Sequence, residues 1–311
     1  MNFLRLIRFP NLFIVALTQY LLQYLILLPA LSKIHISPYL PHFPFFLLVL
    51  STVLIAAGGY IINDIEDVDI DKLNKPLKKQ IVGRVYPLSI AWFFYAFFSV
   101  VGFIISLYLA FYIHDFLQLV IYPLAVALLW AYSKWLKRLP LIGNLVVSFF
   151  CAFVAWVIFY AQSLYVPSAT EIEQGYYGFQ LDILFIFIIY AVLAFISTLF
   201  REIIKDIEDA EGDKAGNCRT LPIVLGVKKS KGVACVVGVF FLFIVVYFSF
   251  ILRGGILQKT LLNLTISLPI LCALFLLIKA KTKEDFSFLS KLAKVIMLSG
   301  LIFLLILKIN E

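Results

Sequence analysis

Charged side chains are scarce in this chain of 311 residues. Only 14% of the residues are Asp, Glu, Lys or Arg, whereas 63% are hydrophobic and the mean hydropathy is +1.02. A soluble domain is about half apolar and roughly a quarter charged. The composition therefore excludes a water-soluble enzyme, a disordered chain and a nucleic-acid-binding module. The net charge of +8 indicates instead the preference of membranes for basic residues on one side.

Cysteine and histidine are few as well, with four and three residues. No C-x-x-C pair occurs, and three of the cysteines lie inside apolar runs, where a thiol behaves as a small hydrophobic group. The sequence therefore predicts neither a disulfide framework nor a zinc site. The basic start, with Arg5 and Arg8, resembles a signal peptide, but the apolar run from Phe13 past Leu28 is too long for one. We expect a retained first helix.

Nine long apolar runs dominate the chain. Each is long enough to cross about 30 Å of hydrocarbon as a helix of about 20 residues. The sequence therefore predicts an all-α integral membrane protein, with residues 1–311 forming a single transmembrane domain. The runs are residues 10–32, 43–63, 87–113, 116–135, 141–164, 179–204, 232–252, 258–279 and 287–307.

Basic residues are distributed unevenly among the connections between these runs. If the N-terminus is cytoplasmic, 22 of the 26 lysines and arginines lie on the cytoplasmic side, and the exceptions are Lys33, Arg253, Lys259 and Lys308. Cytoplasmic loops of membrane proteins carry such an excess. We therefore expect a protein of the cytoplasmic membrane with the N-terminus in and the C-terminus out, because one helix more or fewer would destroy the asymmetry.

Eleven of the 18 acidic residues gather in two short clusters, at 64–71 and 202–213. The clusters follow the second and the sixth run, so both are expected at cytoplasmic ends of helices. Their main members recur every three or four residues, and Asn63 joins Asp67 at i+4. This spacing places each set on one face of a helix. The two stripes are Asp64, Asp67 and Asp71, and then Glu202, Asp206, Asp209 and Asp213.

Carboxylates stacked on one helix face repel one another, and more strongly beside hydrocarbon. We therefore expect a cation to neutralise each stripe. Oxygen ligands without His or Cys suit Mg²⁺ or Mn²⁺, and Mg²⁺ is usually held by a few carboxylates together with substrate phosphates. The stripes thus predict a catalytic magnesium and diphosphate cradle at the cytoplasmic face. Its predicted metal ligands are Asp64, Asp67, Asp71, Asp206, Asp209 and Asp213.

Solvated loop charge is the simpler interpretation of such clusters. It accounts for the acids off the stripes, which are Glu66, Asp69, Glu208 and Glu211. It does not account for helical register beside membrane spans, where ionisable groups usually serve function.

Basic and polar residues nearby are candidates for binding the diphosphate. Arg201 and Lys205 lie one turn apart beside the second stripe, Tyr132 and Lys137 end the fourth run, and Asn144 begins the fifth. A departing diphosphate needs positive charge and hydrogen-bond donors. The positive-inside bias would by itself account for the basic residues among them.

Four segments resemble one family, the UbiA superfamily of intramembrane prenyltransferases. The run Asn63-Asp64-Ile65-Glu66-Asp67-Val68-Asp69-Ile70-Asp71 is similar to its N-D-x-x-D-x-x-x-D signature, and Arg201 to Asp213 is similar to its second aspartate motif. Tyr132-Ser133-x-x-x-Lys137-Arg138 with Gly143-Asn144 resembles the segment between them, and Arg5-x-x-Arg8-x-Pro10-Asn11 the usual opening. The resemblance covers residues 5 to about 226.

This resemblance implies nine helices around a central cavity, with Mg²⁺ and a polyprenyl diphosphate bound at its cytoplasmic mouth. Loss of diphosphate would give an allylic cation, which a lipophilic acceptor captures. The second motif is most similar to that of enzymes that prenylate a prenylglyceryl phosphate, so a geranylgeranylglyceryl phosphate-type acceptor is the first choice. Its phosphate is expected near Arg8, Asn11 and the 72–84 loop.

Three alternative functions can be compared with this one. An aromatic acceptor of quinone biosynthesis, such as 4-hydroxybenzoate, could use the same basic groups, and residues 77–83 lack the proline of the second basic-Pro pair that many family members carry there. A cation transporter would carry its acids nearer the middle of the membrane. A CDP-alcohol phosphotransferase would carry a D-G-x-x-A-R signature, which this sequence lacks.

Overall fold

The computed structural model describes residues 2–68, 80–163, 168, 170, 176–252 and 254–308. In these ranges the chain is helical apart from turns and one isolated bridge between Val82 and Tyr86. The chain divides into two compact units, each described here by itself. Unit 1 comprises Met1–Tyr20, Ala30–Leu136 and Val157–Gln180, and unit 2 comprises Leu21–Pro29, Lys137–Trp156 and Leu181–Glu311. The expectation of one domain over residues 1–311 stays a prediction, as does the central cavity.

Eight of the described helices are long and apolar enough to cross a membrane. The run expected at 116–135 forms a shorter apolar helix, Leu119–Lys134, so every one of the nine predicted runs is helical among the described residues. The all-α membrane fold is confirmed. The eight spans are Phe9–Lys33, His42–Glu66, Leu88–Tyr112, Ile142–Gln162, Gln180–Ala215, Val227–Ile251, Ile256–Lys279 and Lys283–Ile306.

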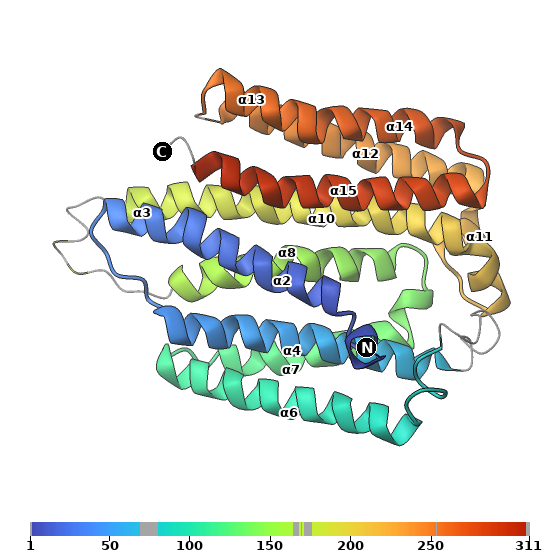
Figure 1. Cartoon of the computed structure of the whole chain (residues 1–311), viewed down its shortest axis with the longest axis horizontal. Helices are drawn as coiled ribbons and strands as arrows, with labels where there is room; N and C mark the ends of the chain where they lie inside the picture. Colours follow the sequence, from blue (N-terminus) through green and yellow to red (C-terminus); the bar gives the residue numbers. More distant parts are fainter. Residues whose placement is uncertain are drawn as a thin grey trace. The chain divides into compact units, whose positions relative to one another are not determined.

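Unit 1 is built around α4 (His42–Glu66), which packs on α6 (Leu88–Tyr112) and α7 (Gln118–Lys134) (Figure 1). The helices approach closely where Gly102 faces Tyr122, because a Cβ at Gly102 would lie 1.8 Å from the Tyr122 hydroxyl oxygen. That hydroxyl donates to the Phe98 carbonyl oxygen at 3.1 Å. Small residues at such crossings are typical of membrane helices.

The chain enters unit 1 through α1 (Asn2–Leu6) and α2 (Phe9–Leu21). Leu6 is fully buried and belongs to the same core cluster as Ile61 and Ile62 of α4. The start of the chain is thereby held against the C-terminal part of α4, where the first acidic cluster begins. The first span then continues through a π-helical turn, η1 (Leu22–Leu27), into α3 (Leu28–Lys33).

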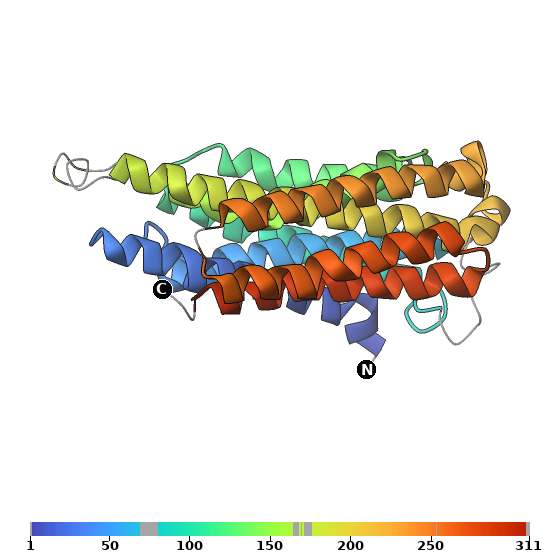
Figure 2. The same ribbon diagram turned by 90° about the horizontal axis from the view of Figure 1, so that it is seen from above.

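Unit 2 contains most of α10 (Tyr176–Ala215), the short α11 (Leu221–Leu225), and α12 (Val227–Ile251). It also contains α13 (Ile256–Leu262), the π-helical turn η4 (Asn263–Ser267), α14 (Leu268–Lys279) and α15 (Lys283–Lys308). α12 packs on α14, and α14 on α15 (Figures 1 and 2). Phe200 and Ile204 of α10 share one core cluster with Ala273 of α14 and Ala293 of α15. That cluster identifies the face of α10 on which α14 and α15 pack.

Three polar side chains within the spans of unit 2, those of Ser249, Asn263 and Ser267, are paired with one another. Asn263 Nδ2 donates to Ser249 Oγ at 2.8 Å, and Ser267 Oγ donates to Asn263 Oδ1 at 2.9 Å. Hydrocarbon offers no hydrogen-bond partners, so such groups need partners inside the protein. The pairing agrees with a membrane location for this unit.

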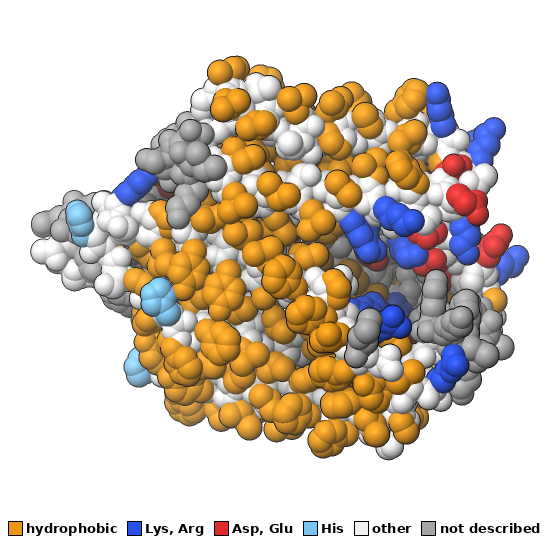
Figure 3. Space-filling model, in the orientation of Figure 1, with side chains coloured by type: hydrophobic (Ala, Val, Ile, Leu, Met, Phe, Trp, Pro, Cys, Tyr) orange, Lys and Arg blue, Asp and Glu red, His pale blue; other side chains and the backbone are white. Residues whose placement is uncertain are grey.

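The surface of the spans is strongly apolar. Phe93 is 64% exposed, Phe250 77% and Ile256 82%, and exposing a side chain of this size to water instead of burying it costs about 1.5–3 kcal/mol. Hydrophobic side chains cover the middle of α10 and α15, whereas acidic and basic side chains gather toward the ends of these helices near α11 (Figure 3). The chain is therefore an integral membrane protein.

Candidate functional site

The first acidic cluster lies at the C-terminal end of α4. The helix continues to Glu66, and Asp67 is its C-cap residue. Asn63 Nδ2 donates to Asp67 Oδ2 at 3.1 Å, so the expected i+4 contact is confirmed. Asp71 lies outside the described residues, and its place in the stripe stays a prediction.

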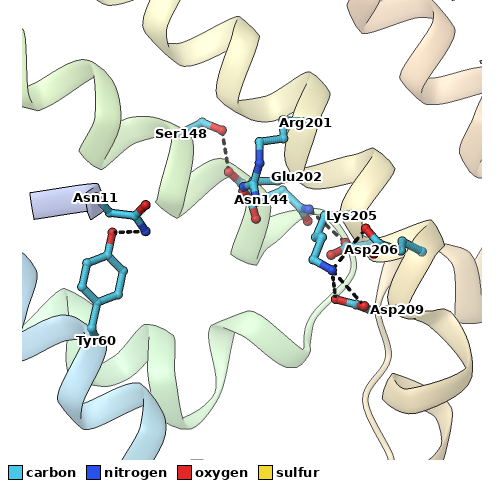
Figure 4. Close-up of polar contacts among 10 residues, drawn as sticks. Asn11, Tyr60, Asn144, Ser148, Arg201, Glu202, Lys205, Asp206 and Asp209 are labelled. Carbon is cyan, nitrogen blue, oxygen red and sulfur yellow. Dashed lines mark hydrogen bonds and ion pairs between the residues drawn. The ribbon is translucent and has the colours of Figure 1, made fainter. Parts of the chain in front are cut away.

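Arg8 contacts this cluster from the start of the chain. Its guanidinium donates to Asp64 Oδ1 at 3.2 Å and lies 4.8 Å from the centroid of the Tyr60 ring. Asn11 Nδ2 donates to the hydroxyl oxygen of Tyr60 at 3.3 Å (Figure 4). The side chain of Asp64 is only 12% exposed, against 41% for Arg8. Arg8 and Asn11, which the sequence predicts as acceptor-binding residues, thus contact the last turns of α4.

Tyr60 is a residue of this site that sequence reasoning missed. It precedes Asp64 by four residues, so it occupies the same helix face one turn earlier. This spacing could have identified Tyr60 from the sequence. The chain has 31 Phe and 16 Tyr, however, so an aromatic residue at this spacing is weak evidence for a site.

The second acidic cluster lies entirely within α10. The apolar run ends at 204, but the helix extends to Ala215, so the whole second stripe is helical. Lys205 Nζ contacts Asp209 Oδ2 at 2.9 Å and Glu208 Oε2 at 3.2 Å. Ion pairs at i,i+3 and i,i+4 stabilise a helix, which favours its continuation beyond the apolar run.

Asn144 holds the first aspartate of the second motif. It lies on α8 (Ile142–Ser163), and its Nδ2 donates to Asp206 Oδ2 at 2.9 Å (Figure 4). Asn144 is 6% exposed, and the Ser148 hydroxyl donates to its carbonyl oxygen at 2.7 Å. The structure therefore brings together two residues that the sequence nominated 62 positions apart.

Two acids that the sequence set aside or left unassigned take part in the charge pattern of α10. Glu208 was expected to be a solvated loop charge, but its side chain is 14% exposed, against 46% for Asp209, and it pairs with Lys205. The interpretation of Glu208 as a solvated charge is wrong, because its side chain is mostly buried and forms an ion pair with Lys205. Glu202 forms an ion pair with Arg201, its neighbour in sequence.

The end of the second motif is fixed by the turn after α10. Thr220 Oγ1 donates to Asp213 Oδ2 at 3.1 Å, and the Cys218 amide donates to the Asp213 carbonyl oxygen at 2.9 Å. The Arg219 amide donates to the Arg138 carbonyl oxygen at 2.8 Å. Thr220 is a second residue that the site predictions missed.

Tyr132 and Lys137 lie near the end of α7 and in a short 3₁₀ turn, η3 (Leu136–Arg138). Both side chains are half-buried. Their role toward the leaving group stays a prediction.

The donor set of the motifs suits Mg²⁺. Five predicted ligands are described, and all offer carboxylate oxygens (Asp64, Asp67, Asp206, Asp209 and Asp213). Within the described ranges no three His, Cys, Asp or Glu residues converge on one point. Mg²⁺ requires less than that, because it is usually held by one or two carboxylates plus water and phosphate oxygens.

The chain itself supplies part of the positive charge that the stripes need. Arg8 neutralises Asp64, and Lys205 neutralises Asp209. The inference that only a bound cation could neutralise the stripes was therefore too strong. The residues present still fit Mg²⁺, since each ion pair occupies only part of the acceptor capacity of a carboxylate.

Comparisons with known proteins agree with these motifs. The model of the UbiA prenyltransferase family matches residues 26–295. The chain is 33% identical over 239 residues to a protein of Thermococcus kodakarensis named digeranylgeranylglyceryl phosphate synthase, covering 76% of each. It is 36% identical over 188 residues to a protein of the same name from Sulfolobus acidocaldarius, covering 60% of this chain and 59% of that one. The match thus spans about three fifths of the Sulfolobus relative.

Solved structures show the same fold. One, from work on digeranylgeranylglyceryl phosphate synthase in membranes, has a TM-score of 0.65 and 25% identity, covering 98% of this chain and 96% of that chain. A UbiA homologue from Archaeoglobus fulgidus bound to GPP and Mg²⁺ has a TM-score of 0.59 and 16% identity, covering 98% and 99%. A family match over most of the chain, together with this fold, establishes that the protein belongs to the UbiA prenyltransferase family.

Proposed function

We propose that this chain is a Mg²⁺-dependent membrane prenyltransferase. It transfers a prenyl group from a polyprenyl diphosphate to a geranylgeranylglyceryl phosphate-type acceptor. The observation that carries the proposal is the set of aligned carboxylates on α10, of which Asp206 is held by Asn144 and Asp209 by Lys205. The relatives from Thermococcus and Sulfolobus, both named digeranylgeranylglyceryl phosphate synthase, support the choice of acceptor.

Each motif has its own task in this proposal. Asp64 and Asp67 of the first motif, with Asp71 beyond the described residues, and Asp206, Asp209 and Asp213 of the second would hold Mg²⁺. When bound, the ion neutralises diphosphate oxygens and makes the diphosphate a better leaving group. Asn63 and Asn144 orient Asp67 and Asp206, so that these carboxylates need no reorganisation when substrate arrives.

The basic residues serve the leaving group. Arg201 and Lys205 on α10 and Lys137 in η3 supply positive charge toward the diphosphate, and Tyr132 supplies a donor. The allylic carbon–oxygen bond breaks and its electron pair leaves with the diphosphate. The acceptor hydroxyl oxygen then attacks the allylic cation and loses its proton, which forms an ether bond.

The orientation in the membrane is part of the same proposal. The excess of lysine and arginine on one side supports an N-terminus in the cytoplasm and a C-terminus outside. Both motifs then lie at the cytoplasmic face, where a water-soluble Mg²⁺ pool and diphosphate are available.

A competition experiment tests the acceptor. Purified protein in detergent receives labelled geranylgeranyl diphosphate, Mg²⁺ and equal amounts of geranylgeranylglyceryl phosphate and 4-hydroxybenzoate, and the products are identified by mass spectrometry. The proposal predicts an ether lipid. A product with an acid-stable bond between the prenyl group and a ring carbon, without ether lipid, would replace the first acceptor with the aromatic one.

A further inference from the structure

Lys294 is the deepest charge on α15. The helix begins at Lys283, so Lys294 lies about 16 Å along it at 1.5 Å per residue. Residues 295–307 after it carry no charge. A lysine so far into a span is costly, and such residues usually face a partner or a ligand.

One side of Lys294 adjoins the packed face of α15, whereas Lys291 and Leu298 on its other side are exposed. Ser290 and Leu301 share its side of α15 at i−4 and i+7, and they are 5% and 6% exposed. The adjacent Ala293 is 2% exposed and belongs to the core cluster that contains Ile203 and Ile204 of α10. Lys294 is itself exposed, so its side chain lies at the edge of the packed face rather than within it.

The neighbours of Lys294 on α10 are charged residues that already have closer partners. Arg201, Glu202, Lys205 and Glu208 all lie within electrostatic range of its ammonium group. Glu202 is paired with Arg201, and Glu208 with Lys205. In the part of the chain that the structure describes, no ion pair within 4.0 Å engages Lys294. The ammonium group of Lys294 therefore has no direct ion-pair partner among the described residues.

Arg201 provides a second, independent observation in this part of α10. Its Nε is buried and has no hydrogen-bond partner among the described residues. An unsatisfied buried donor on a charged group costs free energy. A guanidinium edge and an ammonium group on facing helices form the donor set that recognises phosphate.

We propose that Lys294 and Arg201 together bind a phosphate group of a substrate at the α10–α15 face. The proposal rests on the proposed function for the identity of the substrates. Two groups have the required chemistry, namely the diphosphate of the prenyl donor and the phosphate of the glyceryl acceptor. Lys294 is then a binding residue contributed by the last span, which neither aspartate motif includes.

The test compares Lys294→Ala with Lys291→Ala in the purified full-length protein. Lys291 is an exposed lysine one turn earlier on the same helix, outside the proposed site. Lys294→Arg keeps the charge, and Lys294→Met keeps the length of the side chain in case the alanine variant does not fold. Apparent KM for the donor and for the acceptor is measured separately. Thermal stabilisation by inorganic pyrophosphate and by glycerol phosphate is measured in parallel.

Loss of one charge-assisted contact should raise KM for one of the two substrates about tenfold to a hundredfold. Lys294→Arg should retain most of the affinity, and Lys291→Ala should leave both KM values unchanged. In the Lys294→Ala variant, stabilisation by pyrophosphate should fall if Lys294 binds the prenyl donor. Stabilisation by glycerol phosphate should fall if Lys294 binds the acceptor. The thermal stabilisation measurement tests phosphate binding by Lys294 even if the wild-type protein transfers no prenyl group. Unchanged KM and stabilisation in a folded Lys294→Met variant would overturn the proposal, as would equal losses in Lys291→Ala.

Discussion

Asn144 on α8 and Asp206 on α10 are joined by a hydrogen bond of 2.9 Å between Asn144 Nδ2 and Asp206 Oδ2. Asn144 is 6% exposed, so little water can reach its amide and compete for this bond. The bond fixes the side chain of the first aspartate of the second motif before any ligand arrives.

Removing this donor should lower activity. A hydrogen bond to a charged group contributes about 1.5–3 kcal/mol, so Asn144→Ala should reduce kcat/KM for the prenyl diphosphate about tenfold to a hundredfold. Ser148→Ala is the matched control, because Ser148 donates to the main chain of its own helix and not to the carboxylate. Steady-state kinetics in detergent provide the measurement. Equal losses in both variants would mean that α8 packing, not the orientation of Asp206, is what the substitution disturbs.

Stripe carboxylates should matter far more than neighbouring acids. Asp209→Asn removes charge with little change in shape, and it should lower turnover about a hundredfold or more. Glu211→Gln makes the same change two residues later, at an exposed position off the stripe, and should have little effect. Turnover is measured for both variants at saturating substrate. A Glu211→Gln loss as large as that of Asp209→Asn would refute the helical-face assignment.

The ion pair between Arg8 and Asp64 should be detectable as a coupling energy. Because Arg8 is 41% exposed, the coupling should be small, about 0.5–1 kcal/mol in unfolding free energy. A double-mutant cycle of Arg8→Ala and Asp64→Asn, followed by denaturation in detergent, isolates this energy. The exposed Arg5 serves as control, and Arg5→Ala should add independently to Asp64→Asn. Zero coupling for Arg8 would remove the proposed link between the start of the chain and α4.

Much of the fold was predictable because nine apolar runs of sufficient length leave few alternatives. The helix ends were less predictable, since hydropathy reports lipid contact and not helical hydrogen bonding. The α10 run ends at 204, yet Lys205, Glu208 and Asp209 extend the helix through their own ion pairs. The π-helical turns η1 and η4 leave no mark in hydropathy at all.

The nominated carboxylates came from spacing along single helices, and the same spacing predicted the contact between Asn63 and Asp67. Contacts between distant segments could not be predicted. Arg8 and Asp64 are 56 positions apart, and Asn11 and Tyr60 are 49 apart. Motif resemblance nominated Arg8 and Asn11, and its position at the start of the fifth run nominated Asn144. Only the packing of helices determines that Asn144 contacts Asp206 and that Arg8 contacts Asp64.

Membrane orientation is testable by cysteine labelling. In a variant without the four native cysteines, Thr170→Cys should react with a membrane-impermeant reagent from outside. Lys281→Cys, in the connection between α14 and α15, should react only from the cytoplasmic side. Labelling of Thr170→Cys from the cytoplasm would reverse the topology and the face on which the motifs lie.

Stoichiometry of transfer tests the central claim most directly. Purified protein is mixed with labelled geranylgeranyl diphosphate and geranylgeranylglyceryl phosphate, and both diphosphate release and labelled lipid are measured with Mg²⁺ or with a chelator. A Mg²⁺-dependent prenyltransferase should release one diphosphate for each prenyl group transferred, and the chelator should abolish both signals until Mg²⁺ is restored. Transfer that persists in the chelator, or diphosphate release without a prenylated acceptor, would contradict the account.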